Sequence, residues 1–169
     1  PLFAFMYLLI SEINYDAAFA KKEGLGARYN ESLMMLVQNI QQGRGLANAY
    51  LNGDSSFKGE LTLIHSRIED NIRAVDGLDR RFGKTIPIAG EWRSLKEKWE
   101  YLREGMFLMS AKESFDAHFS VIDDTLLLMV KVADVSNLTL DPEIDSYYLM
   151  DTVVSKLPLV SEYAGQIRG

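Results

Sequence analysis

QQGRGLANAYLNGD, residues 41–54, is the stretch that decides the fold, because a helical pattern runs into it and ends within it. Apolar residues recur there every three or four positions, as on one face of a helix: Leu33, Val37, Ile40, Ala47 and Leu51. Arg44 falls inside this stripe, where a charge must be paired or must contact a ligand, because burying it alone is costly. Gly43 and Gly45 flank it; each costs about 1 kcal/mol relative to alanine in a helix, but lets another group approach closely. Gly53 then ends the helix in a turn.

Composition restricts the class of protein. The 169 residues suit one domain, and 47% hydrophobic with 25% charged residues is ordinary for a folded chain. The net charge of −6, without a basic run, argues against a nucleic-acid partner. The absence of cysteine excludes disulfides and thiolate zinc sites, and two histidines, His65 and His118, are too few for most histidine-rich metal sites. We therefore expect no metal and no cofactor.

The first ten residues, PLFAFMYLLI, carry no charge. They are too few to span a bilayer, which takes about 20 apolar residues, so they are either the end of a membrane-spanning helix or a buried helix end. A signal peptide is disfavoured, because no basic region precedes them and no small-residue cleavage site follows. Glu12 and Asp16 come before the first lysine, Lys21, which is typical of the translocated side of a membrane.

The pattern predicts helices throughout and no strand, which makes the fold all-α. The first helix covers residues 2–51, and Asp54, Ser55 and Ser56 offer N-caps for a second one. The second helix has a seven-residue apolar period in which Asn71 fills one place, and residues 83–90 form a loop. Its apolar positions are Phe57, Leu61, Ile64, Ile68, Val75, Leu78 and Phe82.

A third helix is predicted to begin near Glu91, and the capping-box pattern Ser110-x-x-Glu113 predicts that a fourth begins there and runs to about Val135. One continuous third-plus-fourth helix is the alternative. Asp141 and Pro142 open the fifth helix. Pro158 should kink it, and its apolar face should continue through a set of three residues. Those residues are Val160, Ala164 and Ile167.

The helix lengths suggest the topology. The first helix has about 50 residues, as do the fourth and fifth together, whereas the second and third have about 25 and 20. We expect an elongated antiparallel bundle with four helices in the half remote from the N-terminus and a two-helix extension in the near half. The fifth helix should be roughly collinear with the fourth. Residues 8–20 and 157–168 should then pair with a second copy, as a homodimer.

Four stretches carry a family resemblance: LLISEINYDAAFAKKEGLGARY at 8–29, QQGRGLANAYLNGD, ESFDAHF at 113–119 and LDPEIDSYYLMDTVVSKLPLVSEYAGQIRG at 140–169. With them the chain resembles the extracytoplasmic helical sensor domains of bacterial transmembrane receptors, namely methyl-accepting chemotaxis proteins and sensor histidine kinases. The setting of Arg44, Gln-x-x-Arg-Gly, is also similar to that in nitrate- and nitrite-sensing helical domains. Relatives often have histidine before the Arg-Gly pair, where this chain has Gly43.

The resemblance implies a ligand-sensing domain, residues 11–169, that lies in the periplasm. Residues 1–10 would be the end of a transmembrane helix, a second helix would follow Gly169, and a cytoplasmic signalling module would lie elsewhere in the protein. It implies a membrane-anchored homodimer that binds a small molecule, and no enzyme activity.

Five residues are the candidate ligand site. Arg44 offers a planar donor fork for an anion or a carboxylate, although a buried ion pair with Asp151 or Glu113 is the alternative. His118 lies in the fourth-helix stripe, where a hydrogen-bonded core histidine is the usual finding. The remaining candidates share one turn of the fifth helix, where aromatic core packing is the alternative: Tyr147, Tyr148 and Asp151.

Catalysis finds little support, since the chain has no cysteine nucleophile, no glycine-rich phosphate loop, no His-x-x-x-His pair and no Glu-x-x-His pair. Trp92 and Trp99 share one helix face and are expected in the core. Two functions of different classes remain. One is a ligand-sensing receptor domain, and the other is a ligand-free structural or protein-interaction bundle. The apolar residues 2–10 and the inward Arg44 favour the sensor.

Overall fold

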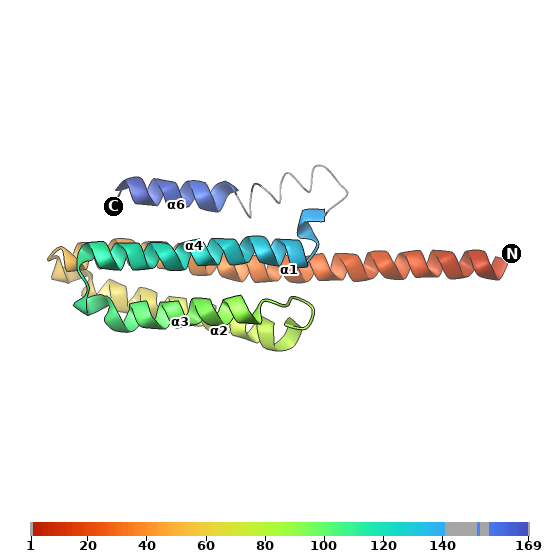
Figure 1. The fold of residues 1–169 in the computed structure, drawn as a ribbon, viewed down its shortest axis with the longest axis horizontal. Coiled ribbons are helices and arrows are strands. Elements are labelled where there is room, and N and C mark those ends of the chain that lie inside the picture. The colour runs from red at the N-terminus through yellow and green to blue at the C-terminus, as the bar shows by residue number, and fades with distance from the viewer. Residues whose placement is uncertain (1, 141–151, 153–155, 169) are drawn as a thin grey trace.

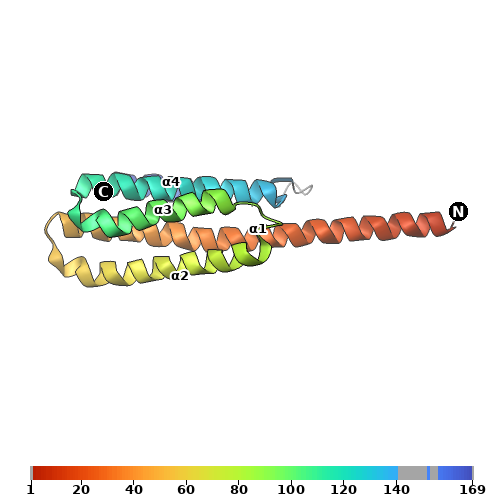
Figure 2. The ribbon, with the colours of Figure 1, turned by 60° about the horizontal axis from the view of Figure 1, so that its bottom comes forward.

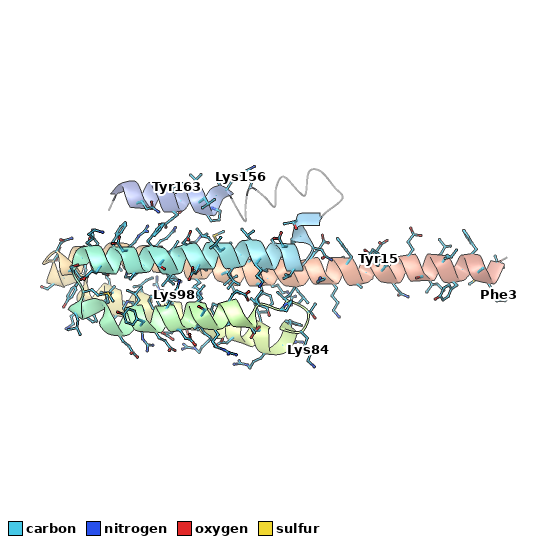
Figure 3. All side chains as sticks on the ribbon, in the orientation of Figure 1. Phe3, Tyr15, Lys84, Lys98, Lys156 and Tyr163 are labelled. Atoms are coloured by element: carbon cyan, nitrogen blue, oxygen red, sulfur yellow. The ribbon has the colours of Figure 1, made fainter. Side chains whose placement is uncertain are left out.

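The first helix is a single long rod, as the sequence predicts. The computed structural model describes residues 2–140, 152 and 156–168. Helix α1, Leu2–Leu51, has 50 residues and is about 75 Å long at 1.5 Å per residue. Residues 2–24 have no buried side chain, and this half of α1 extends alone beyond the other helices (Figure 1). Phe3 and Tyr15 project from it into open space (Figure 3).

Three further helices pack beside the second half of α1 (Figures 1 and 2). They are α2, Lys58–Phe82, α3, Ala89–Gly105, and α4, Ala111–Val135. Helix α1 packs mainly against α4 and α2, and α3 packs against both α4 and α2. Every described element is helical, which confirms the all-α class. The largest side chains of the shared core are Trp92, Trp99, Tyr29, Leu33, Leu36, Ile40, Leu61 and Ile68.

The helix ends follow from local sequence. Gly53 has φ +108°, a backbone conformation that favours glycine, and the Asp54 side chain accepts a hydrogen bond from the Ser56 backbone N–H. Ser110 and Glu113 form the predicted capping box. The alternative of one continuous third-plus-fourth helix is wrong, because Met109 and Ser110 are extended. The third helix begins at Ala89, two positions before the predicted Glu91.

Helix α4 ends against a glycine of α1. A Cβ added to Gly26 would lie 2.0 Å from Ser136 Oγ and 2.8 Å from Leu138 Cδ1, so this crossing requires glycine. Gly24, two positions earlier, has nothing within 4 Å of an added Cβ. Directly after α4, Asn137 has φ 70° and leads into the short 3-10 helix Leu138–Leu140. The close contact at Gly26 therefore determines at which point along α1 helix α4 ends.

Three polar side chains within the packed helices, Asn71, Trp92 and Trp99, are hydrogen-bonded to side chains of neighbouring helices. A hydrogen bond between side chains joins α1 and α2: Asn39 Nδ2 donates to Asn71 Oδ1 at 2.6 Å. Asn71 thus fills its place in the apolar stripe as half of a hydrogen-bonded pair. Trp92 and Trp99 are core residues, as expected, and their indole N–H groups donate to Asp76 at 2.7 Å and to Glu69 at 3.0 Å.

Helix α6, Leu157–Arg168, differs from the prediction. The helix lengths predict that the fifth helix is collinear with the fourth and lies near the exposed half of α1. In the structure α6 lies beside the packed half, with the C-terminus at the opposite end of the molecule from the N-terminus (Figure 1). Glu162 of α6 pairs with the buried Arg44, and this pairing is the physical reason for the position. Residues 157–168 therefore do not form a joint surface with residues 8–20 in one chain.

The buried face of α6 also differs from the predicted one. Val160 is 62% exposed and Ala164 is exposed, whereas Pro158 and Glu162 are buried. Pro158 stands in the first turn of α6, where its missing N–H leaves no helical hydrogen bond unmade. The predicted start of the fifth helix at Asp141 and Pro142 lies outside the described residues.

Candidate functional site

Arg44 is a buried charge on the packed face of α1. It is 3% exposed and belongs to the same helix face as Ile40 and Ala47, both fully buried. Helices place a residue every 100° around their axis, so a position three or four residues from two core positions must itself face inward. The prediction that Arg44 points into the protein is therefore correct.

The partner of the guanidinium is Glu162, which is itself 3% exposed. Arg44 Nη1 donates to Glu162 Oε1, and Nη2 donates to Oε2 at 3.2 Å, so the pair is bidentate. Two amides complete the coordination of the carboxylate: Gln41 Nε2 donates to Oε2 at 2.9 Å, and Gln166 Nε2 donates to Oε1 at 3.0 Å. Both carboxylate oxygens thus accept two hydrogen bonds, which satisfies a buried charge.

Two further contacts hold the arginine. The Phe115 ring of α4 lies under the guanidinium, with Cζ 4.8 Å from the ring centroid. On α6, a Cβ at Gly165 would lie 2.7 Å from Arg44 Nη2, so any larger residue there would require the guanidinium to shift. Arg44 therefore joins α1, α4 and α6 at one point.

A cleft of about 400 Å³ opens beside this pair. Residues from all three helices line it: Gln41, Gln42, Arg44, Gly45, Asn48, Phe115, Ser161 and Gly165. The lining offers hydrogen-bond donors and acceptors, one guanidinium and one aromatic ring. Gly45 leaves open space, since nothing lies within 4 Å of an added Cβ there. The cleft therefore has the size and the polar groups to take a small ligand.

His118 is buried in the core and does not line the cleft. It is fully buried, and its Nδ1–H donates to the Ser114 carbonyl at 2.7 Å. Its Nε2 has no hydrogen-bond partner among the described residues. Burial, together with the neighbouring His65 and Arg44, lowers the pKa of His118 to about 4, although the hydrogen bond to Ser114 acts in the opposite direction. His118 is thus a neutral core histidine, and the ligand contact predicted for it is not available in this arrangement.

His65 of α2 has a similar environment. Its ring stands edge-on to Trp99 with centroids 5.4 Å apart, and its buried Nε2 has no hydrogen-bond partner in the described part of the chain. Burial lowers its pKa, and Arg103 adds to the effect. Among the described residues, no group of three or more His, Asp or Glu side chains could hold a metal ion.

The remaining residues that the sequence suggested for the site are three on the fifth helix and one possible partner of Arg44. Tyr147, Tyr148 and Asp151 lie outside the described residues. Glu113, offered as a partner of Arg44, is exposed and accepts hydrogen bonds from the Ser110 backbone and hydroxyl in the capping box. Those bonds lower the pKa of Glu113, and they occupy its carboxylate. The proposed Arg44–Glu113 pair is therefore wrong, because Glu113 caps the start of α4 instead.

Sequence reasoning missed Glu162, Phe115 and Gly165. Phe115 is three residues, slightly less than one helical turn, before His118 on α4, so the pattern of the fourth helix could have suggested it. Glu162 carried a weaker signal: with Gln166 four residues later, it makes a polar pair on one face of a short helix. Such a pair usually faces solvent, and only the three-dimensional structure shows that it faces Arg44.

Comparison with protein-family models, curated proteins and solved structures finds no match for the chain. The resemblance to bacterial sensor domains therefore stays a prediction that depends on the residues quoted for it.

Proposed function

We propose that this chain is the extracytoplasmic ligand-sensing domain of a bacterial transmembrane signalling receptor, either a chemoreceptor or a sensor kinase. Its role is binding rather than catalysis. The ligand is a small molecule that carries an anionic group, and it binds in the cleft beside Arg44. Helices α1 to α4 form the antiparallel four-helix bundle of the sensor, and the periplasm is the compartment.

One observation carries the proposal: α1 joins an apolar, unpacked segment and a buried arginine in one uninterrupted helix. By length and composition alone, an 18-residue window in the N-terminal part of α1 could cross a membrane, and none of that window is buried. Arg44 lies in the same helix beside the cleft. A displacement of α1 at the cleft would be transmitted along a rigid helix to residues 2–10, which is what a receptor requires.

The proposal includes a homodimer. Residues 8–20 are largely exposed, and they include apolar side chains that have no partner within the described part of the chain: Leu8, Leu9, Ile10 and Ile13 are 64%, 42%, 54% and 65% exposed. A second copy would cover them in a receptor whose helices are held side by side by a membrane. Sedimentation at increasing concentration should then show a monomer–dimer equilibrium, and a strict monomer would count against the pairing.

The second candidate is a ligand-free structural or protein-interaction bundle. The observation that favours it is the complete pairing of Arg44 with Glu162, because a satisfied ion pair needs no ligand. A thermal-shift screen of small metabolites and anions separates the two functions. A sensor gains stability with at least one compound in proportion to ln(1 + [L]/Kd), and a spacer gains none.

A further inference from the structure

The carboxylate of Glu162 has the environment that a bound carboxylate ligand would have. It accepts hydrogen bonds from both terminal guanidinium nitrogens of Arg44 and from the Gln41 amide, which belong to α1, and from the Gln166 amide of α6 itself. Arg44 and Gln41 are three residues apart, so they share a helix face and converge on one point. Bidentate pairing with arginine is specific for planar oxyanions such as carboxylates. Three of these four hydrogen bonds come from α1, whereas Glu162 belongs to a separate helix.

Apart from the contact between Glu162 and Arg44, the orientation of helix α6 is energetically unfavourable. It buries Glu162 and Pro158, and among its described side chains four large apolar ones are partly exposed: Leu157, Leu159, Val160 and Tyr163 are 55%, 40%, 62% and 59% exposed. Figure 3 shows Tyr163 on α6, away from the other helices. Burying two charges costs desolvation energy that the pairing only offsets, so a buried ion pair is weak net stabilisation. Removing either charge would strand the other, so the docking of α6 is coupled to the contact between Arg44 and Glu162, which acts together with the buried Pro158 and the hydrogen bond from Ser161 Oγ to Gln41 Oε1.

We propose that Glu162 is a built-in occupant of the anion position, and that a small-molecule carboxylate binds Arg44 and Gln41 by displacing Glu162 and with it helix α6. This inference rests on the sensor function proposed above, since it names the ligand class and the regulation of the same site. The cleft of about 400 Å³ gives the incoming molecule a place beside the pair before the exchange. The exchange keeps Arg44 paired in both states, so each state is free of a stranded buried charge.

The first test is chemical rescue. In Glu162→Gln the neutral amide leaves the charge of Arg44 unpaired, so the guanidinium is free to bind an external carboxylate through its N–H groups. Acetate, compared at pH 7 with chloride at equal ionic strength, should raise the unfolding midpoint of this variant saturably, by about 2–4 °C at about five times its dissociation constant. Arg44→Gln/Glu162→Gln should show no acetate-specific gain, because the binding group is gone. Nitrate is the second arm, since it is also a planar oxyanion.

A matched control comes from another ion pair. Lys131 of α4 pairs with Glu91 of α3 at the surface, where both side chains are about half exposed. Glu91→Gln frees a cation that water already solvates, so acetate should not stabilise this variant more than chloride does. An equal acetate gain in Glu91→Gln would overturn the inference as a general salt effect. A gain of Glu162→Gln with nitrate but not with acetate would overturn the carboxylate class.

The second test uses the wild-type chain and needs no variant to fold. Acetate should accelerate hydrogen exchange of the amides of residues 157–168, about sixfold at five times the dissociation constant found by rescue, and leave the core amides of α1 and α4 unchanged. Unchanged or slower exchange in α6 would overturn the displacement. That failure differs from failure of the sensor function, in which no compound of the thermal-shift screen stabilises the wild type.

Discussion

Acid should destabilise the fold through His118, and the size of the effect follows from the structure. The imidazole is fully buried and donates to the Ser114 carbonyl, while its other nitrogen has no hydrogen-bond partner among the described residues. Burial holds its pKa at about 4, against an ordinary value of 6.5. The perturbation is His118→Asn, because the asparagine amide is able to donate to Ser114 but does not titrate.

The sign follows from proton binding. The unfolded chain binds a proton at His118 below pH 6.5, whereas the folded chain does so only below about 4. The stabilisation is therefore complete above pH 6.5 and is lost as the pH falls towards 4. The difference of about 2.5 between these two pKa values corresponds to about 3 kcal/mol of unfolding free energy across this pH range. His65 has a lowered pKa as well and acts in the same direction.

The assay is urea unfolding of both proteins at pH 7.5 and at pH 4.5. Other titrating groups change equally in the two, so the difference isolates His118. The wild type should lose about 2–3 kcal/mol more than His118→Asn between these pH values. Equal losses would refute the reasoning, because they would mean that the imidazole is already protonated in the folded state or is solvated there.

Two other pairs of variants test the packing. Gly26→Ala should lower stability by about 1–3 kcal/mol, because its methyl group meets Ser136, whereas Gly24→Ala should be neutral or stabilising by up to about 1 kcal/mol, since it adds a helix former in open space. Thermal melting of both distinguishes the close crossing from simple helix propensity, and a cost at Gly24 as large as at Gly26 would contradict it. Asn71→Ala should cost about 1–3 kcal/mol by leaving Asn39 unpaired, and Asn39→Leu/Asn71→Leu should be close to neutral. Urea denaturation of the single and double variants measures this, and a double variant worse than the single one would argue against the pairing.

Local sequence signals predicted the described helices well. The length of α1, the capping box at Ser110 and the turn at Gly53 are each set by interactions within a few residues. Asn71 was expected to sit in an apolar stripe, and it does, because the heptad spacing alone fixes which face it occupies. Short-range chemistry was sufficient for these features.

The position of α6 could not be predicted in this way. Periodicity shows that Val160 and Ala164 share a face, but not what covers that face, and here solvent does. The inward direction of Arg44 was predictable from its neighbours, yet its partner was not. Several acidic residues could have paired with it, and the choice of Glu162 depends on a contact between residues 118 positions apart. Helix periods contain no information about such long-range pairing.

Calorimetric titration shows whether Arg44 is the anion-binding group of a sensor. The ligand is the compound that stabilises the wild type most in the screen of metabolites and anions. Arg44→Gln should bind it at least about tenfold more weakly, because a charge-assisted bidentate contact is lost. Arg103→Gln is the control, since Arg103 pairs with Glu69 away from the cleft, and it should bind as the wild type does. Equal affinity of Arg44→Gln and the wild type would contradict the account.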